Sequence, residues 1–91
     1  MSQSETERLR HAILDYLVQR RPLAFDSESI SRLLCVNQMI DFKTNQTECF
    51  RELQLLKDFA LVDEIHDPLG STHFYRANGK GILECERMRV P

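Results

Sequence analysis

The sequence has 91 residues, of which 42% are hydrophobic and 29% are charged, a composition typical of a globular domain. We expect one domain, residues 1–91, with a single modest core. No apolar run approaches the roughly 20 residues of a membrane-spanning helix, and no signal pattern opens the chain, so a cytoplasmic protein is expected. The net charge of −2 and the pI near 5.9 argue against strong nonspecific binding to nucleic acid.

Cysteine usage and the lack of catalytic motifs limit the possible chemistry. Cys35, Cys49 and Cys85 are widely spaced and include no Cys-x-x-Cys pair, so we expect reduced thiols and no disulfide framework. The sequence contains no Gly-rich phosphate loop, no Gly-x-Ser-x-Gly and no His-Glu-x-x-His. Its acidic residues are scattered, and the chain leaves little room for a water-excluding pocket. We therefore expect neither an enzyme nor a bound cofactor.

The N-terminal segment has the pattern of a packing helix. Ser4 and Glu7 match a capping box, in which each side chain bonds a backbone amide of the other residue. Apolar residues then recur on one face, namely Leu9, Ala12, Ile13, Tyr16 and Leu17. We expect the helix to end at Arg20-Arg21-Pro22, because proline disfavours helical geometry in the residue before it.

A short extended piece and a second helix are predicted next. Leu23 to Phe25 suits a short strand. Asp26 or Ser27 can cap the helix that follows, because a short side-chain oxygen accepts from the unpaired amides of a first turn. Its apolar residues are Ile30, Leu33 and Leu34. No glycine lies between Cys35 and Lys43 to force a tight turn, so the helix is expected to continue to about Met39.

The stretch from Thr44 to Ile65 predicts a third helix that leads directly into a strand. Thr44 or Asn45 can cap this helix, and Glu48 is favourable near its positive end. One face carries Cys49, Phe50, Leu53, Leu56 and Ala60. A second face carries Thr47, Arg51, Gln54 and Asp58. We expect the first face to enter the core and the second to meet water or a partner.

The remaining residues predict a hairpin and a closing element. Leu61 to His66 and Thr72 to Ala77 suit strands, and Asp67 to Ser71 contains the turn formers proline and glycine. Asn78-Gly79 is a further turn signal. Lys80 to Arg87 suits either a third strand or a helix, and its apolar residues do not alternate, which favours a short helix.

Two segments carry a resemblance to a known superfamily. CFRELQLLKDFALVDEI, residues 49–65, resembles the last helix and first wing strand of winged helix-turn-helix DNA-binding domains. HFYRANGKG, residues 73–81, resembles the tyrosine-bearing wing strand and turn of bacterial regulators in that superfamily. The resemblance implies an α+β fold with a three-helix core, a small antiparallel β wing and room for a short C-terminal helix. The interval from Ile30 to Leu53 is several residues longer than in compact members.

The resemblance also implies double-stranded DNA as the partner. Arginine, asparagine and glutamine match base edges in the major groove, so Arg51 and the residues before it are candidates for contact. The candidate DNA-binding residues are Lys43, Thr44, Asn45, Gln46, Thr47 and Arg51 at the third helix, and His73, Tyr75 and Arg76 in the wing. The alternative is an ordinary solvated face. The wing tip has no positive charge, and one of the neighbours Phe74 and Tyr75 is expected in the core.

A metal sensor is a further alternative, because His11, His66, His73, Cys49 and Cys85 are residue types that bind zinc or iron. The order CFREL, LVDEI, HFYR is similar to the DNA-binding half of ferric-uptake-regulator proteins, in which Phe50-Arg51 would match a Tyr-Arg pair. Phe50 lacks the hydroxyl, and the sequence shows no histidine-rich segment. We therefore expect no metal site, with Cys49 as a buried core thiol.

Two functional hypotheses follow. The first is a sequence-specific DNA-binding regulator acting as a homodimer, with the dimer contact in the tail from Ile82 to Val90 or on apolar surface of the first helix. The second is a protein-interaction module that lacks DNA binding and uses the apolar region from Val36 to Phe42. Exposure of Val36, Met39, Ile40 and Phe42 would favour the second hypothesis, and their burial would count against it.

Overall fold

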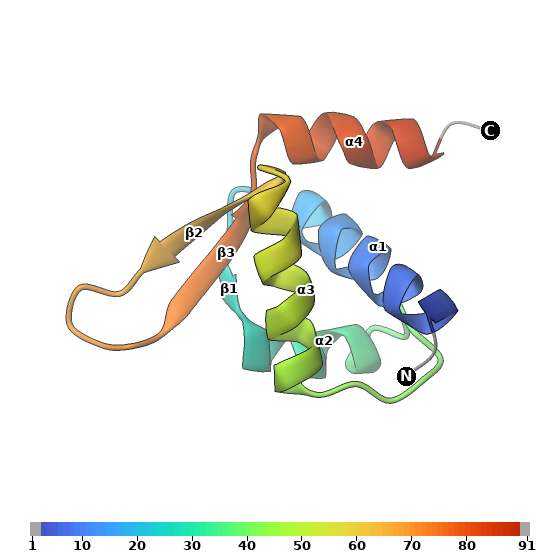
Figure 1. Ribbon diagram of the computed structural model, residues 1–91, viewed down its shortest axis with the longest axis horizontal. Coiled ribbons are helices and arrows are strands. Elements are labelled where there is room, and N and C mark those ends of the chain that lie inside the picture. Colours follow the sequence, from blue (N-terminus) through green and yellow to red (C-terminus); the bar gives the residue numbers. More distant parts are fainter. Residues whose placement is uncertain (1–2, 90–91) are drawn as a thin grey trace.

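A computed structural model describes residues 3–89 of the chain, with side chains as far as Met88. The elements are α1 (Gln3–Gln19), β1 (Phe25–Asp26), α2 (Ser27–Val36), α3 (Gln46–Asp58), β2 (Val62–His66), β3 (His73–Ala77) and α4 (Gly79–Arg89). Helices α1, α2 and α3 pack together as one body, and β2 and β3 extend from it as a hairpin (Figure 1). Helix α4 packs on α1, on the side of the molecule opposite α2 (Figure 1).

The core lies where the apolar stripes of the helices meet the sheet. Leu9, Ile13 and Leu17 of α1 are fully buried, as their spacing predicts. Ile30 and Leu34 of α2 are fully buried as well. The other fully buried large side chains are Leu14, Cys49, Leu53, Leu56 and Tyr75. Burial of one large apolar side chain contributes about 1.5 to 3 kcal/mol, so this cluster is the main source of stability.

Two helix boundaries differ from the predicted ones. Helix α1 begins at Gln3, so Ser4 lies inside the helix and the predicted capping box is wrong. Helix α2 stops short of Met39, because Gln38 adopts a left-handed conformation with φ of 56°. The amide of Met39 then bonds the carbonyl of Leu34 at 3.0 Å, which closes the helix end. This ending usually contains glycine, so nothing in the sequence signalled it.

Both ends of α3 are defined by local hydrogen bonds. Asn45, one of the two predicted candidates, is the N-cap, and its Oδ1 accepts from the amide of Glu48 at 2.9 Å. At the other end Ala60 adopts a left-handed conformation with φ of 61°, and the amide of Leu61 bonds the carbonyl of Leu56 at 3.0 Å. The chain therefore leaves α3 sharply and enters β2 at once.

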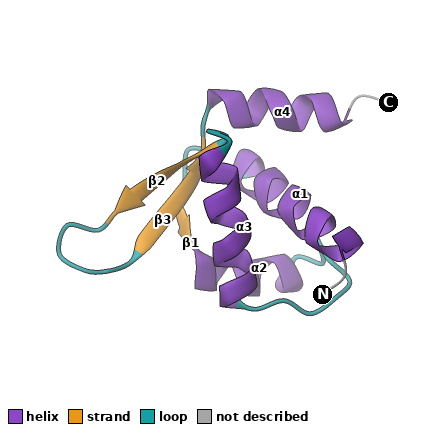
Figure 2. Ribbon diagram, in the orientation of Figure 1, coloured by secondary structure: helices purple, strands orange, loops and turns teal. Residues whose placement is uncertain are grey.

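The sheet has the strand order β1-β3-β2, and both pairings are antiparallel (Figure 2). Tyr75 is the central residue, since it pairs with Phe25 on one side and with Glu64 on the other. The short strand expected at Leu23 to Phe25 lies slightly later in the chain. Its last residue, Asp26, is also the N-cap of α2, although its side chain makes no capping bond.

The residues after the wing form a helix, which was the favoured of the two predictions. Asn78 Oδ1 accepts from the amide of Gly81 at 2.9 Å, and Asn78 Nδ2 donates to the carbonyl of Ala60 at 2.8 Å. One side chain thus caps α4 and holds the turn between α3 and β2. The whole arrangement is the expected α+β winged helix-turn-helix. No helix within residues 3–89 is long and apolar enough to cross a membrane.

Candidate nucleic-acid interface

Helix α3 exposes a mixed polar and aromatic surface, which we call the outer face of α3. It consists of Gln46, Thr47, Phe50 and Arg51, all of which are exposed. On the opposite side of the helix Cys49, Leu53 and Leu56 are buried in the core, as predicted. Because a helix repeats every 3.6 residues, burial of this stripe forces the outer face toward the surroundings.

The structure corrects the predicted core side of α3 at three residues. Phe50 was expected in the core but is 43% exposed. Glu52 takes a place on the buried side and is only 5% exposed, because its carboxylate oxygen lies 2.8 Å from Arg10 Nε on α1. The buried face of the helix is therefore rotated toward Glu52. Ala60 lies beyond the helix and is exposed, so it is not part of the core either.

The cations at this surface differ in whether they have partners. Arg51 and Lys43 are exposed and form no ion pair with the part of the chain that the structure describes. Lys57 is paired with Glu64, at 2.8 Å between Nζ and Oε1. At α3, Arg51 and Lys43 are therefore the basic side chains available to an anionic partner.

Two of the candidate residues at the start of α3 have structural contacts. Asn45 Oδ1 is occupied by the capping bond to the Glu48 amide. Thr44 is half-buried, and its hydroxyl donates to the carboxylate of Glu48 at 3.3 Å. Gln46 and Thr47 follow them and are exposed, so their side chains remain accessible. Neighbouring Cys49 is buried, which raises the pKa of its thiol to about 11.

A hydrogen-bonded cluster joins α3 to the wing. Gln54 Nε2 donates to Glu64 at 3.0 Å and to the hydroxyl of Tyr75 at 2.7 Å. The hydrogen bond from Lys57, followed by those from Tyr75 and Gln54, lowers the pKa of Glu64 to about 2 despite its partial burial. Burial and the bond to Glu64 raise the pKa of Tyr75 to about 12, so its phenol stays neutral. This cluster sets the angle of the wing relative to α3.

The wing residues predicted to contact DNA are not equivalent. Tyr75 is fully buried, which removes it from the set of residues that can touch DNA and makes it a positioning residue. His73 packs on His66, with ring centroids 4.5 Å apart, and its buried Nδ1 makes no hydrogen bond although Glu64 Oε2 lies 3.2 Å away. Arg76 is exposed, 3.9 Å from Asp63, and remains available.

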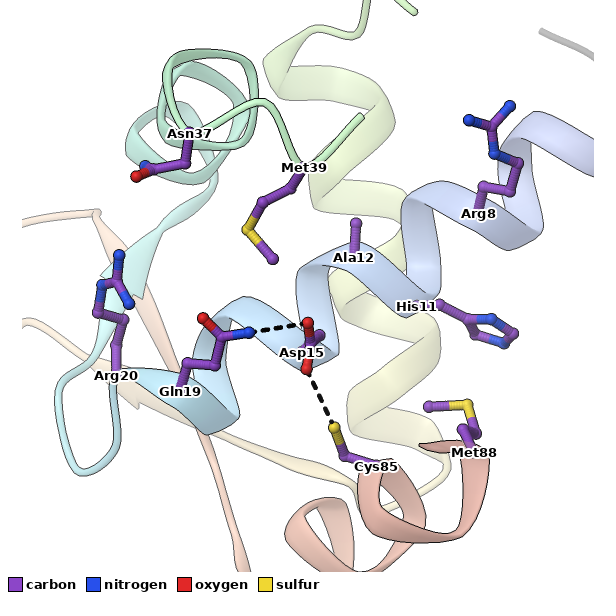
Figure 3. A pocket seen from close by; sticks show the side chains of 10 residues that line it. All are labelled: Arg8, His11, Ala12, Asp15, Gln19, Arg20, Asn37, Met39, Cys85 and Met88. Carbon is purple, nitrogen blue, oxygen red and sulfur yellow. Dashed lines mark hydrogen bonds between the residues drawn. The ribbon is translucent and has the colours of Figure 1, made fainter. Parts of the chain in front are cut away.

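A separate hollow of about 670 Å³ lies between α1, the segment after α2, and α4 (Figure 3). Its lining includes Asp15, which accepts from Gln19 Nε2 at 2.9 Å and from Cys85 Sγ at 3.4 Å. None of the lining residues belongs to α3 or the wing. The hollow is thus distinct from the outer face of α3. Within residues 3–88, no group of three or more histidine, cysteine or carboxylate side chains is placed to hold a metal.

The apolar region proposed as a protein-binding surface is mostly occupied by the core. Met39, Ile40 and Phe42 are half-buried and pack against the core cluster. Val36 alone among these residues is largely exposed, at 70%. A single exposed valine does not form a contiguous apolar patch, so the structure does not favour the interaction-module hypothesis.

Similarity to known proteins is found by comparison of structures and not by comparison of sequences. No family model matches the sequence, and no curated protein matches it. A solved transcriptional regulator from Clostridium thermocellum has a TM-score of 0.77 at 13% identity, covering 97% of this chain and 84% of that one. A PadR-like transcription factor from Bacteroides fragilis has a TM-score of 0.72 at 17% identity, covering 94% of this chain and 81% of that one.

A third similar structure is PadR from Bacillus subtilis, which was solved in complex with operator DNA. The TM-score is 0.72 at 17% identity, and the match covers 91% of this chain and 47% of that one. This chain therefore spans about half of the length of that PadR chain. At these identities the likeness establishes the winged helix-turn-helix fold.

Proposed function

We propose that this chain is a sequence-specific DNA-binding transcriptional regulator, in which the outer face of α3 enters the major groove. The observation that supports this most directly is the exposed Arg51, which has no ion pair among the described residues and lies on a helix whose opposite side is anchored in the core. Arginine binds both acceptors of a guanine edge, and Gln46 can bind adenine in the same way. The likeness to PadR, solved with operator DNA, points in the same direction.

The remaining candidates have supporting roles in this proposal. Lys43 lies just before α3 and is placed to contact phosphate. Asn45 caps the start of the helix and Thr44 precedes it, and the N-terminus of a helix favours phosphate oxygens. Arg76 and His73 on β3 supply wing contacts to the backbone, while the tip carries no cation.

We further propose that the protein acts as a cytoplasmic homodimer that contacts DNA through two copies of α3. One domain of this size makes few base contacts, and a dimer doubles them. Helix α4 is the better candidate for the dimer contact, because Leu83 is 65% exposed on it, whereas the apolar stripe of α1 is buried. Val90, at the end of the segment predicted for this contact, lies outside the described residues.

Fluorescence anisotropy with labelled duplexes tests the DNA-binding proposal. Duplexes are selected from a random library with the full chain, and affinity is measured between about 50 and 200 mM salt, where phosphate contacts make binding strongly salt-dependent. Arg51→Ala should weaken binding to the selected duplex by roughly 1–3 kcal/mol and relax base preference at one position per half-site. The same change at Arg20, just after α1 and beside the hollow, serves as the control, because that site lies outside α3, the wing and the proposed dimer contact. Enrichment of no duplex at low salt would contradict the proposal.

A further inference from the structure

Phe50 is an unusual component of the outer face of α3. It is a large apolar side chain, 43% exposed, at a position where the neighbouring exposed side chains are polar. Its neighbours one turn earlier are Gln46 and Thr47, and Arg51 follows it directly. Isolated exposed apolar residues are common on protein surfaces, so exposure alone assigns no role. The relevant observation is that Phe50 lies among side chains that match base edges.

The residue one turn after Phe50 is not free to contact bases. Gln54 donates its amide hydrogens to Glu64 and to Tyr75, at 3.0 and 2.7 Å. These bonds commit Gln54 to holding the wing. Within residues 47–54 of α3, the exposed side chains are those of Thr47, Phe50 and Arg51.

The major groove offers one apolar group to such a ring. Each base pair presents hydrogen-bond donors and acceptors there, and only thymine adds a methyl group, at C5. A phenyl ring cannot satisfy the donors and acceptors, but it removes a methyl group from water. We propose that Phe50 contacts the C5-methyl group of a thymine and thereby makes the chain select thymine at the base pair beside the one that Arg51 contacts. This inference depends on the proposed function, because it requires α3 to enter the major groove.

Replacement of thymine by uracil tests this directly, because it removes the methyl group and leaves the base-pair hydrogen bonds unchanged. The probes are duplexes selected by the wild-type chain and resynthesised with uracil in place of each thymine in turn. At one thymine per half-site, uracil should weaken binding about fourfold, the factor that corresponds to one buried methyl group. Uracil at the remaining thymines should change the affinity by much less.

Variants at position 50 separate the ring from the rest of the helix. Phe50→Ala should bind thymine and uracil duplexes equally at that position, whereas Phe50→Leu should retain most of the discrimination. Phe59→Ala is the matched control, because Phe59 is also an exposed phenylalanine but lies at the end of α3, and its discrimination should equal that of wild type. Circular dichroism verifies that each variant is folded.

The outcomes distinguish this inference from the proposed function. Selection of specific duplexes that bind equally well with uracil at every position would overturn the role of Phe50 and leave DNA binding intact. Discrimination that persists in Phe50→Ala would assign the methyl contact to another residue and overturn the inference as well. Failure of the chain to enrich any duplex would contradict both proposals together.

Discussion

At the level of single residues, three side chains donate hydrogen bonds to the carboxylate of Glu64. Lys57 and Gln54 reach it from α3, at 2.8 and 3.0 Å, and Tyr75 bonds it from the neighbouring strand. All of these contacts favour the ionised carboxylate, which is why the pKa of Glu64 falls from 4.5 to about 2. Glu64 therefore links the position of the wing to that of α3 through its charge.

A pH-dependent contribution of Glu64 to stability follows. Since the pKa is lower in the folded chain, the ionised carboxylate stabilises the fold above about pH 4.5, and this contribution is lost as the pH falls from 4.5 toward 2. Glu64→Gln should lower the free energy of unfolding at pH 7 by about 1–2 kcal/mol, measured by urea denaturation. The difference from wild type should shrink at pH 3.5. Glu86→Gln, at an exposed site on α4, is the control, and a difference independent of pH would refute this account.

Among the elements, the helices α2 and α3 end in the same way. Each ends with a residue other than glycine in the left-handed conformation, Gln38 after α2 and Ala60 after α3. The paired bonds that follow, such as Ala60 amide to Lys57 carbonyl at 2.8 Å, satisfy the last carbonyls of the helix. A side chain in this conformation is strained by contact with its own backbone, and glycine is not.

Relief of this strain should stabilise the fold. Ala60 is exposed, so Ala60→Gly removes little packing, and the bond from Asn78 is made by the backbone carbonyl, which is kept. We expect the free energy of unfolding to rise by about 0.5–1 kcal/mol, as the strain relieved exceeds the extra entropy of glycine in the unfolded chain. Chemical denaturation measures this free energy of unfolding. Ala24→Gly, at a residue between two elements, is the comparison variant. A loss of stability in Ala60→Gly would show that the left-handed conformation is not strained.

Helix α4 depends on a close approach that only glycine permits. A methyl group added at Gly81 would overlap the carbonyl oxygen of Leu61 and lie 3.3 Å from Leu14 Cδ1. The first turn of α4 therefore packs directly on the turn between α3 and β2. This contact and the capping bond from Asn78 together fix the position of α4 relative to α3. They therefore also fix the position of Leu83, which is exposed on α4.

Across the whole molecule, some basic side chains are neutralised by ion pairs and others are not. The chain has 12 basic and 14 acidic residues. The basic side chains in ion pairs are Arg8, Arg10, Lys57, Arg76 and Arg87. Among the residues that the structure describes, the basic side chains without such a pair are Arg20, Arg21, Arg32, Lys43, Arg51 and Lys80. Of these, Arg51 lies on α3 and Lys43 just before it. An acidic protein can thus still present positive charge at one surface.

The salt dependence of DNA binding should reflect this distribution. Each phosphate that is neutralised contributes about −0.9 to the slope of log affinity against log salt, so the small number of free cations at α3 predicts a shallow slope. Lys43→Ala should reduce the steepness by about one per bound protomer and weaken all duplexes alike. Arg20→Ala, just after α1 and beside the hollow, should leave the slope unchanged. A changed base preference in Lys43→Ala would instead make Lys43 a base-contacting residue.

Local patterns were sufficient to predict the order of elements, the apolar stripe of α1, the Asn45 cap and the antiparallel wing. Each of these depends on residues a few positions apart, whose periodicity and turn chemistry act before any distant contact forms. The pattern failed at the ends of α2 and α3, because their left-handed residues, Gln38 and Ala60, are held by backbone bonds that leave no mark on residue type.

Contacts between elements that are distant in sequence determine which side chains of α3 and the wing are accessible. Glu52 is buried because Arg10, far away in sequence, neutralises it, and Phe50 is consequently turned outward. Tyr75 is buried because Gln54 and Glu64 satisfy its hydroxyl inside the fold. Burial of a polar group requires a partner, and the partner comes from another element, so spacing along one segment cannot determine it.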